Sequence, residues 1–311
     1  MTALLALALA QGAGKITLAA VGDVSLTWGV QAQIARKGPG WAFEKAPMLR
    51  TADIAFGNLE CALSKRKGAW KKRYTLIGRP ETGEALRSSG LAVVSVANNH
   101  AFDAGADGFR DTLAALRGLG IAACGTNDDP VIIERKGLKI AFVGFGGYTE
   151  DHSGLIHRIE EQAITRAVTD ARSKADLVVL AMHSGQEGVT HPTAHQRRIA
   201  RVAAQAGADV VLGSHPHVWQ PVEWIRAGGR RCVVAYSLGN FVFAARPGRM
   251  CETGVLEIEL DKSGARAWRK IPMTIRGGRP EPGHPARPAS QKHPRPFEGH
   301  GKASPTNSTP F

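Results

Sequence analysis

From about residue 15 to residue 275, short apolar runs alternate along the chain with amphipathic stretches. The apolar runs predict nine strands, at 15–22, 52–58, 91–98, 121–125, 139–145, 175–182, 208–214, 232–240 and 254–261. Residues 104–120 and 193–209 lie between strands and predict helices that end at a glycine. Apolar strands alternating with helices indicate largely parallel sheets covered on both faces. The pattern therefore predicts one α/β domain over residues 15–276.

The C-terminal stretch has a different composition. Residues 277–311 hold eight of the seventeen prolines and almost no large apolar side chains. Such a segment cannot bury enough surface to offset its ordering entropy, so we predict a disordered, basic, Pro- and Gly-rich tail. Its three histidines, His284, His293 and His300, are spread through this polar sequence, which argues against a metal site there.

The first fourteen residues leave two interpretations open. Residues 3–10 are apolar and end in Ala-Leu-Ala, as before a signal-peptidase site, but the run is short and no Lys or Arg precedes it. A truncated signal peptide would make the protein extracytoplasmic or membrane-associated, whereas an ordinary flexible start would leave it in the cytoplasm. No other apolar run approaches the length of about 18 residues that spans a membrane, so we expect no transmembrane segment.

Composition indicates a globular protein and favours an anionic partner, but it does not identify the function. With 43% hydrophobic and 22% charged residues, the 311-residue chain is typical of globular proteins. The 40 Lys and Arg residues outnumber the 27 Asp and Glu residues, and the net charge of +13 favours anionic partners. The four cysteines include no C-x-x-C pair, which argues against a structural zinc site or a redox motif.

Polar side chains of a particular kind follow six of the predicted strands. In open α/β sheets, functional residues gather beyond the carboxyl ends of the strands, so we expect these side chains to lie together. They are Asp23, Asn58, Glu60, Asn98, Asn99, His100, Asp103, His183, Glu187, His215, His217 and Asn240. Taken singly, each has an ordinary explanation, such as a helix cap, a hydrogen-bonded core histidine or, for Glu187, a solvated acid. Together they offer imidazole, carboxylate and amide ligands that suit Zn, Mn, Fe or Co.

The two histidines of "GSHPHV" have a spacing that supports a metal site. In an extended chain, residues i and i+2 point to the same face, so His215 and His217 could reach toward one point. Pro216 disfavours the helical region for His215, and we therefore predict an extended pair. Gly213, just before them, would let another backbone segment approach closely.

Six blocks, in order, carry a resemblance to a known family: "GDV", "NLE", "VANNHAFDAG", "MHSGQE", "GSHPHV" and "YSLGNFVF". Over roughly residues 16–260 the chain resembles the CapA-type family of poly-γ-glutamate capsule synthesis proteins, which is similar to the calcineurin-like metallophosphoesterases. The resemblance implies a two-sheet αββα sandwich of the metallophosphoesterase type with two divalent metal ions, of Mn, Zn, Fe or Co. The metal ligands that it implies are Asp23, Asn58, Glu60, Asn99, His183, His215 and His217.

The resemblance also implies that His100 is a catalytic imidazole. Asp103 would be its orienting partner or, as an equal alternative, the cap of the helix that follows. The chain departs from the phosphoesterase pattern in two places: Ser25 stands where the first block has a histidine, and the second block reads Asn-x-Glu. These departures leave open how one metal position is built and whether the chain cleaves phosphoesters.

The densest basic segment is "SKRKGAWKKRY", residues 64–74, which surrounds Trp70 with six Lys and Arg residues and no acid. It begins four residues after Glu60, so we expect it to overhang the site. A flexible, solvated loop without a function would have the same composition. We predict that it steers an anionic small molecule or polymer into the site. Basic residues around an aromatic also suit single-stranded nucleic acid, but no nucleic-acid motif accompanies them and we do not expect that partner. The substrate-binding candidates are Lys65, Arg66, Lys71, Lys72, Arg73 and Asn240.

Two functions of different classes follow from this sequence. The first is a metal-dependent hydrolase of the capsule synthesis family, acting on a phosphoester or on an amide of an anionic polymer. The second is a non-catalytic component that binds poly-γ-glutamate and serves membrane-associated proteins of capsule synthesis or export.

Overall fold

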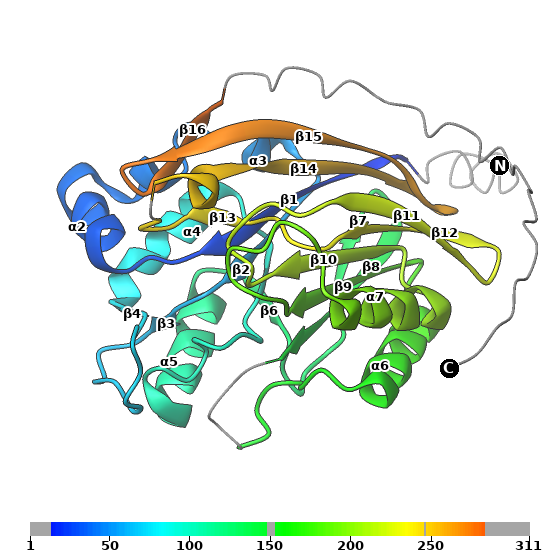
Figure 1. Ribbon diagram of the computed structural model, residues 1–311, viewed down its shortest axis with the longest axis horizontal. Helices are drawn as coiled ribbons and strands as arrows, with labels where there is room; N and C mark the ends of the chain where they lie inside the picture. The colour runs from blue at the N-terminus through cyan, green and yellow to red at the C-terminus, as the bar shows by residue number, and fades with distance from the viewer. Residues whose placement is uncertain (1–13, 148–152, 246, 284–311) are drawn as a thin grey trace, which may run out of the picture.

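Two β-sheets lie face to face at the centre of the computed structural model, which describes residues 14–147, 153–245 and 247–283 (Figure 1). The first sheet has the order β16-β15-β14-β1-β2-β5-β6, with β13 also paired to β1. Its strands are β1 (Ile16–Val24), β2 (Ile54–Leu59), β5 (Val93–Ser95), β6 (Ala122–Cys124), β13 (Asn240–Val242), β14 (Glu252–Asp261), β15 (Gly264–Arg276) and β16 (Arg279–Pro282).

The second sheet has the order β11-β12-β10-β9-β8-β7. Its strands are β7 (Val131–Arg135), β8 (Leu138–Gly146), β9 (Leu177–His183), β10 (Val210–Ser214), β11 (Val222–Ala227) and β12 (Arg230–Ala235). Two very short strands, β3 (Ala62–Leu63) and β4 (Ile77–Gly78), pair with each other outside both sheets.

Side chains alternate between the two faces of each sheet, as the strand period of two requires. On β1, Leu18 belongs to the core between the sheets and Ala19 to the core on the outer face. Phe56 of the first sheet stacks on Phe142 of the second, with ring centroids 6.0 Å apart and planes 6° from parallel. Such aromatic pairs add about 1 kcal/mol beyond the burial of their area. The two sheets therefore share one apolar core.

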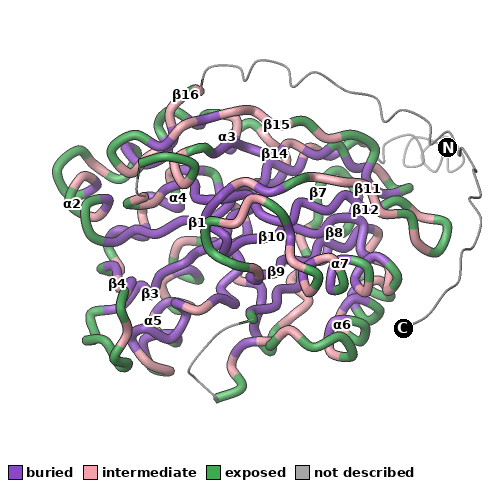
Figure 2. Tube along the Cα trace, viewed as in Figure 1, coloured by how far each residue is buried: buried purple, intermediate pink, exposed green. Residues whose placement is uncertain are grey.

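Helices cover the outer face of each sheet, which completes four layers. The central strands between them, such as β1, β9 and β10, are mostly buried (Figure 2). Val30, Leu86 and Phe109 bring three helices onto the first sheet. Ile164 and Ile199 bring two helices onto the second. The helices are α2 (Trp28–Lys37), α3 (Met48–Thr51), α4 (Glu84–Ser89), α5 (Gly105–Gly118), α6 (Glu161–Lys174) and α7 (Ala194–Ala206), with the 3-10 turns η1 (Pro39–Ala42), η2 (Pro80–Gly83) and η3 (Arg249–Cys251).

The predicted mixed α/β arrangement is confirmed, and both predicted helices form as α5 and α7. Each of the nine predicted strands has a counterpart, but the run 232–240 is divided into the end of β12 and the start of β13. Each sheet is only partly parallel: the parallel strands of the first sheet reach its edge at β6, and those of the second lie in its centre. The first continues through antiparallel β14, β15 and β16, and the second has antiparallel β11 and β7 at its edges. Among the described residues, no helix is long and apolar enough to span a membrane.

The predicted start of a disordered tail at residue 277 is wrong for its first residues. β16 (Arg279–Pro282) pairs antiparallel with β15, although it contains Pro280 and Pro282. Proline has no backbone N–H to donate to a neighbouring strand. It is tolerated here because β16 is the edge strand of the sheet. The remainder of the predicted tail, 284–311, and residues 1–13 of the N-terminal start lie outside the described residues.

Strand register brings polar residues side by side at the carboxyl ends of the parallel strands. Asp23 near the end of β1 is paired in register with Asn58 of β2 on one side and with Asn240 of β13 on the other. In the second sheet, His183 at the end of β9 is in register with Ser214 at the end of β10. Neighbouring strands thus place these side chains at one edge before any loop contributes.

We predict that Gly213→Ala destabilises the fold. A Cβ at Gly213 would lie 1.9 Å from the carbonyl oxygen of Tyr236, which is backbone and cannot rotate away. The expected loss in free energy of unfolding is about 3 kcal/mol, as for other overpacked sites. Gly118→Ala is the matched control, because nothing lies within 4 Å of its added methyl group. It should change stability by less than about 1 kcal/mol in denaturant titrations. Equal stability of the two variants would contradict the close approach.

Candidate metal centre

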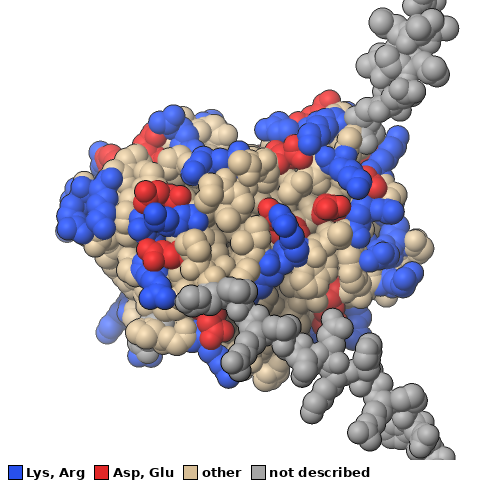
Figure 3. Space-filling view, turned by 90° about the horizontal axis from the view of Figure 1, so that it is seen from above, with Lys and Arg blue, Asp and Glu red and all other residues tan. Residues whose placement is uncertain are grey.

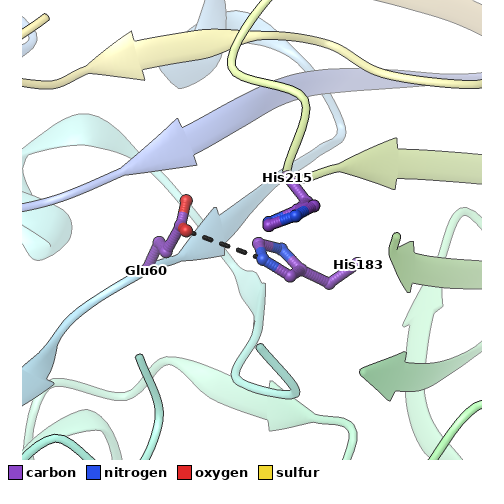
Figure 4. Close-up of side chains that lie close together, drawn as sticks. All are labelled: Glu60, His183 and His215. Atoms are coloured by element: carbon purple, nitrogen blue, oxygen red, sulfur yellow. Dashed lines mark ion pairs between the residues drawn. The ribbon is translucent and has the colours of Figure 1, made fainter. Parts of the chain in front are cut away.

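The ends of strands from both sheets converge on one group of acids and imidazoles. Figure 4 shows Glu60, which follows β2, pointing toward His183 at the end of β9 and His215 just after β10. The Oε1 atom of Glu60 lies 3.6 Å from Nε2 of His183 and 3.8 Å from Nε2 of His217. Oδ2 of Asp23 lies 3.0 Å from Nδ1 of His217. The site is therefore built across the junction of the two sheets.

Three triplets in this group could each hold a metal ion. In each triplet, one ligand atom per residue lies within 4.8 Å of the others. The triplets are Glu60 with His183 and His215, Asp23 with Glu60 and His217, and Glu187 with His215 and His217. Glu60, His215 and His217 each belong to two triplets. The possible metal positions are therefore adjacent, as in a centre with two metal ions.

Glu60 provides the test of whether these residues fit a cation. Its side chain is fully buried, and neither carboxylate oxygen accepts a hydrogen bond from an N–H or hydroxyl group of the described residues. Burial, followed by the neighbouring Asp23 carboxylate, raises the pKa of Glu60 well above its usual value. A buried carboxylate without a donor is costly unless a cation neutralises it, so the residues fit a divalent metal ion.

The imidazoles differ in which charge state they favour. Burial and the nearby His215 lower the pKa of His183, and burial and His217 lower the pKa of His215 to about 4. Both rings are therefore neutral at pH 7, the form that ligates metals. Burial would lower the pKa of His217 as well, but Glu60 and Asp23 beside it outweigh burial and raise that pKa to about 10. Positive charge is favoured at this point, whether an imidazolium or a bound cation carries it.

Amide side chains hold two of the imidazoles in place. Asn240 directs its Oδ1 to Nδ1 of His217 at 2.9 Å, and its Nδ2 donates to the carbonyl oxygen of Met250 at 3.1 Å. This arrangement makes Nδ1 the donor and leaves Nε2 of His217 facing Glu60. Asn99 approaches Nε2 of His183 with its Oδ1 at 2.6 Å. Asn240 thus lies behind the imidazole of His217, and its predicted role in binding substrate stays a prediction.

Asn58 links the two halves of the group. Its Nδ2 donates to Oδ1 of Asp23 at 2.9 Å and lies 3.3 Å from Nδ1 of His183. Asn98, in turn, donates from Nδ2 to the Oδ1 of Asn58 at 3.3 Å and to the carbonyl oxygen of Leu59 at 2.8 Å. All seven residues that were predicted as metal ligands therefore lie in one connected cluster. Their roles as ligands remain predictions.

The turn that carries His215 and His217 is not extended, and that prediction is wrong. His215 has φ 98° and His217 has φ 58°, both in the left-handed region that non-glycine residues seldom adopt. Each such residue costs about 1–3 kcal/mol and persists only where surrounding contacts enforce it. Here Gly188 donates its N–H to the carbonyl oxygen of Pro216 at 2.8 Å. The rings of His215 and His217 still lie 6.0 Å apart, at the same site.

His100 stands beside the cluster with a partner of its own. Its Nδ1 lies 2.7 Å from Oδ2 of the buried Asp103, which also accepts the backbone N–H of Leu76 at 2.6 Å. Asp103 does not cap α5, because Ala104 is the N-cap residue and no side chain caps that helix. Of the two interpretations of Asp103, the structure therefore supports the partner of His100.

The basic loop packs against the segment that carries His100. Trp70 donates its indole N–H to the carbonyl oxygen of Phe102 at 2.9 Å. Lys72 is mostly buried and donates to the carbonyl oxygen of Asn99 at 2.6 Å and to Oδ1 of Asp103 at 2.9 Å. Lys72 is therefore paired with the partner of His100, and its predicted role in binding substrate stays a prediction.

The other basic side chains of this loop have separate environments. Lys65 forms an ion pair with Glu81 at 3.1 Å, and Arg66 forms one with Asp111 at 3.0 Å, so acids on η2 and α5 hold both. Lys71 and Arg73 are exposed and remain the candidates for attracting an anion. On the face seen in Figure 3, Lys and Arg side chains form several groups with acids among them rather than one basic patch.

Comparison with known proteins shows the family of this chain. The family described as "Bacterial capsule synthesis protein PGA_cap" matches residues 17–245. The chain belongs to this family. It is 29% identical over 289 residues to "Capsule biosynthesis protein CapA" of Bacillus anthracis, covering 86% of this chain and 69% of that protein. It is 30% identical over 278 residues to "PGA biosynthesis protein CapA" of Bacillus subtilis, covering 84% of this chain and 72% of that protein.

A more distant relative has a different description. The chain is 26% identical over 212 residues to a "Probable polyglutamine synthesis accessory protein" of Mycobacterium tuberculosis, covering 60% of this chain and 56% of that protein.

Two residues of this PGA_cap chain complete the description of the site. Ser25 is buried, and its hydroxyl lies 2.9 Å from that of Thr27, so β1 brings only Asp23 to the cluster. Glu187 is exposed and lies in the third triplet, although its sequence position had suggested a solvated acid. Its position after the same strand as His183 had already placed it among the residues expected to lie together.

We predict that Glu60→Gln abolishes metal-dependent stabilisation. Metal present at about 100 times its Kd should stabilise the wild-type protein by about 2.7 kcal/mol. In a domain of this size that corresponds to a rise in Tm of about 5–10 °C. Thermal unfolding with and without Mn²⁺ or Zn²⁺ measures the shift. The isosteric variant should show none, because it lacks the carboxylate shared by two triplets.

The matched control for this experiment is Glu81→Gln, which removes an exposed carboxylate from the surface. It should retain the full metal-dependent shift. A full shift in Glu60→Gln would show that the buried carboxylate does not bind the cation.

Proposed function

We propose that this member of the PGA_cap family is a metal-dependent hydrolase that acts on an anionic phosphoester or on an amide of an anionic polymer. The observation that carries the proposal is the buried Glu60 carboxylate, which accepts no hydrogen bond from the described residues and faces His183 and His217. A carboxylate in that state at the junction of two sheets is suited to ligate a catalytic cation. We propose that the four layers form a sandwich of the metallophosphoesterase type.

Two divalent metal ions, of Mn, Zn, Fe or Co, would use the cluster as follows. Glu60, His183 and His215 would hold one ion, with Asn99 beside them, and Asp23, Glu60 and His217 would hold the other. Mixed nitrogen and oxygen ligands favour these borderline metals over Ca²⁺ or Mg²⁺. When bound, such ions supply Lewis-acid chemistry that polarises a substrate oxygen and activates water.

His100 would deliver a proton to the leaving group. With Nδ1 held by Asp103 at 2.7 Å, the ring presents Nε2 as the atom that can transfer a proton. The Asp103 carboxylate would stabilise the imidazolium, as an acid behind a catalytic histidine does in other hydrolases. Lys72 fixes that carboxylate from its other oxygen and so limits its rotation. Asn99, the neighbour of His100, contacts His183, which keeps the imidazole beside the proposed ligands.

The substrate is proposed to be anionic because of the charges at the opening of the site. Lys71 and Arg73 are exposed on a loop that packs against the segment of His100. The whole chain carries a net charge of +13, which raises the local concentration of anions. Poly-γ-glutamate and phosphorylated glycans are polymers of the proposed kind.

A second candidate is a non-catalytic role in which the site binds poly-γ-glutamate for the proteins that make or export it. Ser25 favours this alternative, because its hydroxyl pairs with Thr27 where a phosphoesterase has a histidine. The description of the mycobacterial relative as an accessory protein points the same way. In either role we propose that the chain works outside the cytoplasm or at the membrane, with membrane-associated proteins of capsule synthesis.

We predict that His100→Gln lowers kcat by about 10²–10⁴-fold, the usual contribution of a positioned proton donor. The readouts are hydrolysis of bis(p-nitrophenyl) phosphate and of a γ-glutamyl oligomer by metal-loaded protein. Metal content, measured by elemental analysis, should not change, because His100 belongs to none of the metal triplets. Wild-type protein that binds metal and polymer but hydrolyses neither substrate would establish the non-catalytic role instead.

We predict that Lys72→Met acts through Asp103 and His100. Loss of the ammonium leaves Oδ1 of Asp103 without its 2.9 Å partner, so the carboxylate can rotate away from the imidazole. The expected effect is a fall in kcat of roughly tenfold at unchanged KM. Lys71→Met, which changes an exposed side chain of the same loop, is the control. A rise in KM alone would instead make Lys72 a substrate contact.

A further inference from the structure

The loop between β9 and α7 brings one exposed acid to the buried histidines. A carboxylate oxygen of Glu187 lies within 4.8 Å of a ring nitrogen of His215 and of His217, and these two nitrogens lie equally close to each other. We propose that Glu187 is a metal ligand on the solvent side of the centre, where it adds a carboxylate to the second of the two proposed ions, the one assigned to His217. This inference rests on the proposed metal centre and adds a ligand to it.

Backbone contacts hold Glu187 in a defined place relative to the histidines. On one side, Ser184 donates its N–H to the carbonyl oxygen of Ser214 at 3.1 Å. On the other side, Gly188 donates its N–H to the carbonyl oxygen of Pro216, between the two histidines, at 2.8 Å. The loop is therefore attached to the histidine turn and the strand end before it at two points, three residues before Glu187 and one residue after it.

A side-chain contact extends this attachment beyond Gly188. Gln220, which is buried, donates from Nε2 to the carbonyl oxygens of Val189 at 2.8 Å and of His191 at 3.2 Å. Gln220 also accepts from Gln196 of α7 at 3.0 Å, so the loop is fixed to the body of the domain. A solvated surface acid does not require a loop anchored at three places, whereas a ligand must be held at a fixed distance.

The buried residues of the cluster supply only two carboxylates, those of Asp23 and Glu60, for two ions. β1 brings Asp23 alone, since the Ser25 hydroxyl is paired with Thr27. Glu60 is shared by two of the triplets, so each ion would receive only part of one carboxylate from it. Glu187 adds a carboxylate that the buried residues do not supply. An imidazole together with carboxylates is a common ligand set for Zn²⁺, Mn²⁺ and Co²⁺.

Exposure sets Glu187 apart from the other members of the cluster. Glu60, His183, His215 and His217 are all buried, and Glu187 is exposed. A ligand at the opening can exchange with water more readily than one inside. The ion at this position should therefore be the weaker of the two and the first that a chelator removes.

Titration of the metal-free full chain with Co²⁺ tests the inference. Isothermal calorimetry gives the affinity of each equivalent, and visible absorption of Co²⁺ reports its ligands without any assay of activity. Glu187→Gln should weaken the weaker equivalent at least tenfold and change its absorption, because changes outside the ligand shell already cost about 10–100-fold. Glu134→Gln removes an equally exposed carboxylate on β7 and should match the wild-type protein.

The outcomes separate this inference from the proposed function. If Glu60→Gln prevents Co²⁺ binding while Glu187→Gln binds as the wild type does, the metal centre stands and Glu187 is not a ligand. If the wild-type protein itself binds no Co²⁺, both proposals are overturned. A selective loss of the weaker equivalent in Glu187→Gln alone supports the inference.

Discussion

The burial of Glu60 between two sheets is the constraint on which the rest of this site depends. A carboxylate in that position needs donors or a cation, and the described residues give it no N–H or hydroxyl donor. His183 and His217 instead direct ring nitrogens toward it from the second sheet at 3.6 and 3.8 Å. The sheets must therefore keep their relative position for the cluster to exist. The shared apolar core, with Phe56 stacked on Phe142, provides that position.

Around this centre, polar side chains are arranged in support of one another. Asn240 holds His217, Asp103 holds His100, and Lys72 holds Asp103. These contacts use amide and charged groups whose geometry is fixed by strands or by the loop at 64–74. Strain is present as well, since His215 and His217 both have positive φ. A domain of this size retains such strain where neighbouring contacts enforce a functional geometry.

Much of the cluster could be predicted because its residues follow strand ends, and parallel strands end at one edge. Asp23, Asn58 and Asn240 are neighbours through strand register, and the apolar runs predicted the strands but not how these strands pair. Family resemblance supplied which of the polar residues to expect together, and the match over residues 17–245 confirms the family. β16 was missed because Pro280 and Pro282 are strand-breaking locally, and only its place at the sheet edge makes them acceptable.

The sequence by itself determined the alternation of strands and helices, the choice of imidazole, carboxylate and amide groups, and their positions after strands. Those features are local, and they can be predicted from the periodicity of apolar residues and the chemistry of the side chains. Only the tertiary structure decided which atoms meet: that Lys72 pairs with Asp103, that Asn240 stands behind His217, and that Glu187 lies beside the histidines. The packing of one sheet on the other and the path of two loops set these contacts, which join residues distant in the chain. No local pattern specifies such distances, because they depend on the whole apolar core.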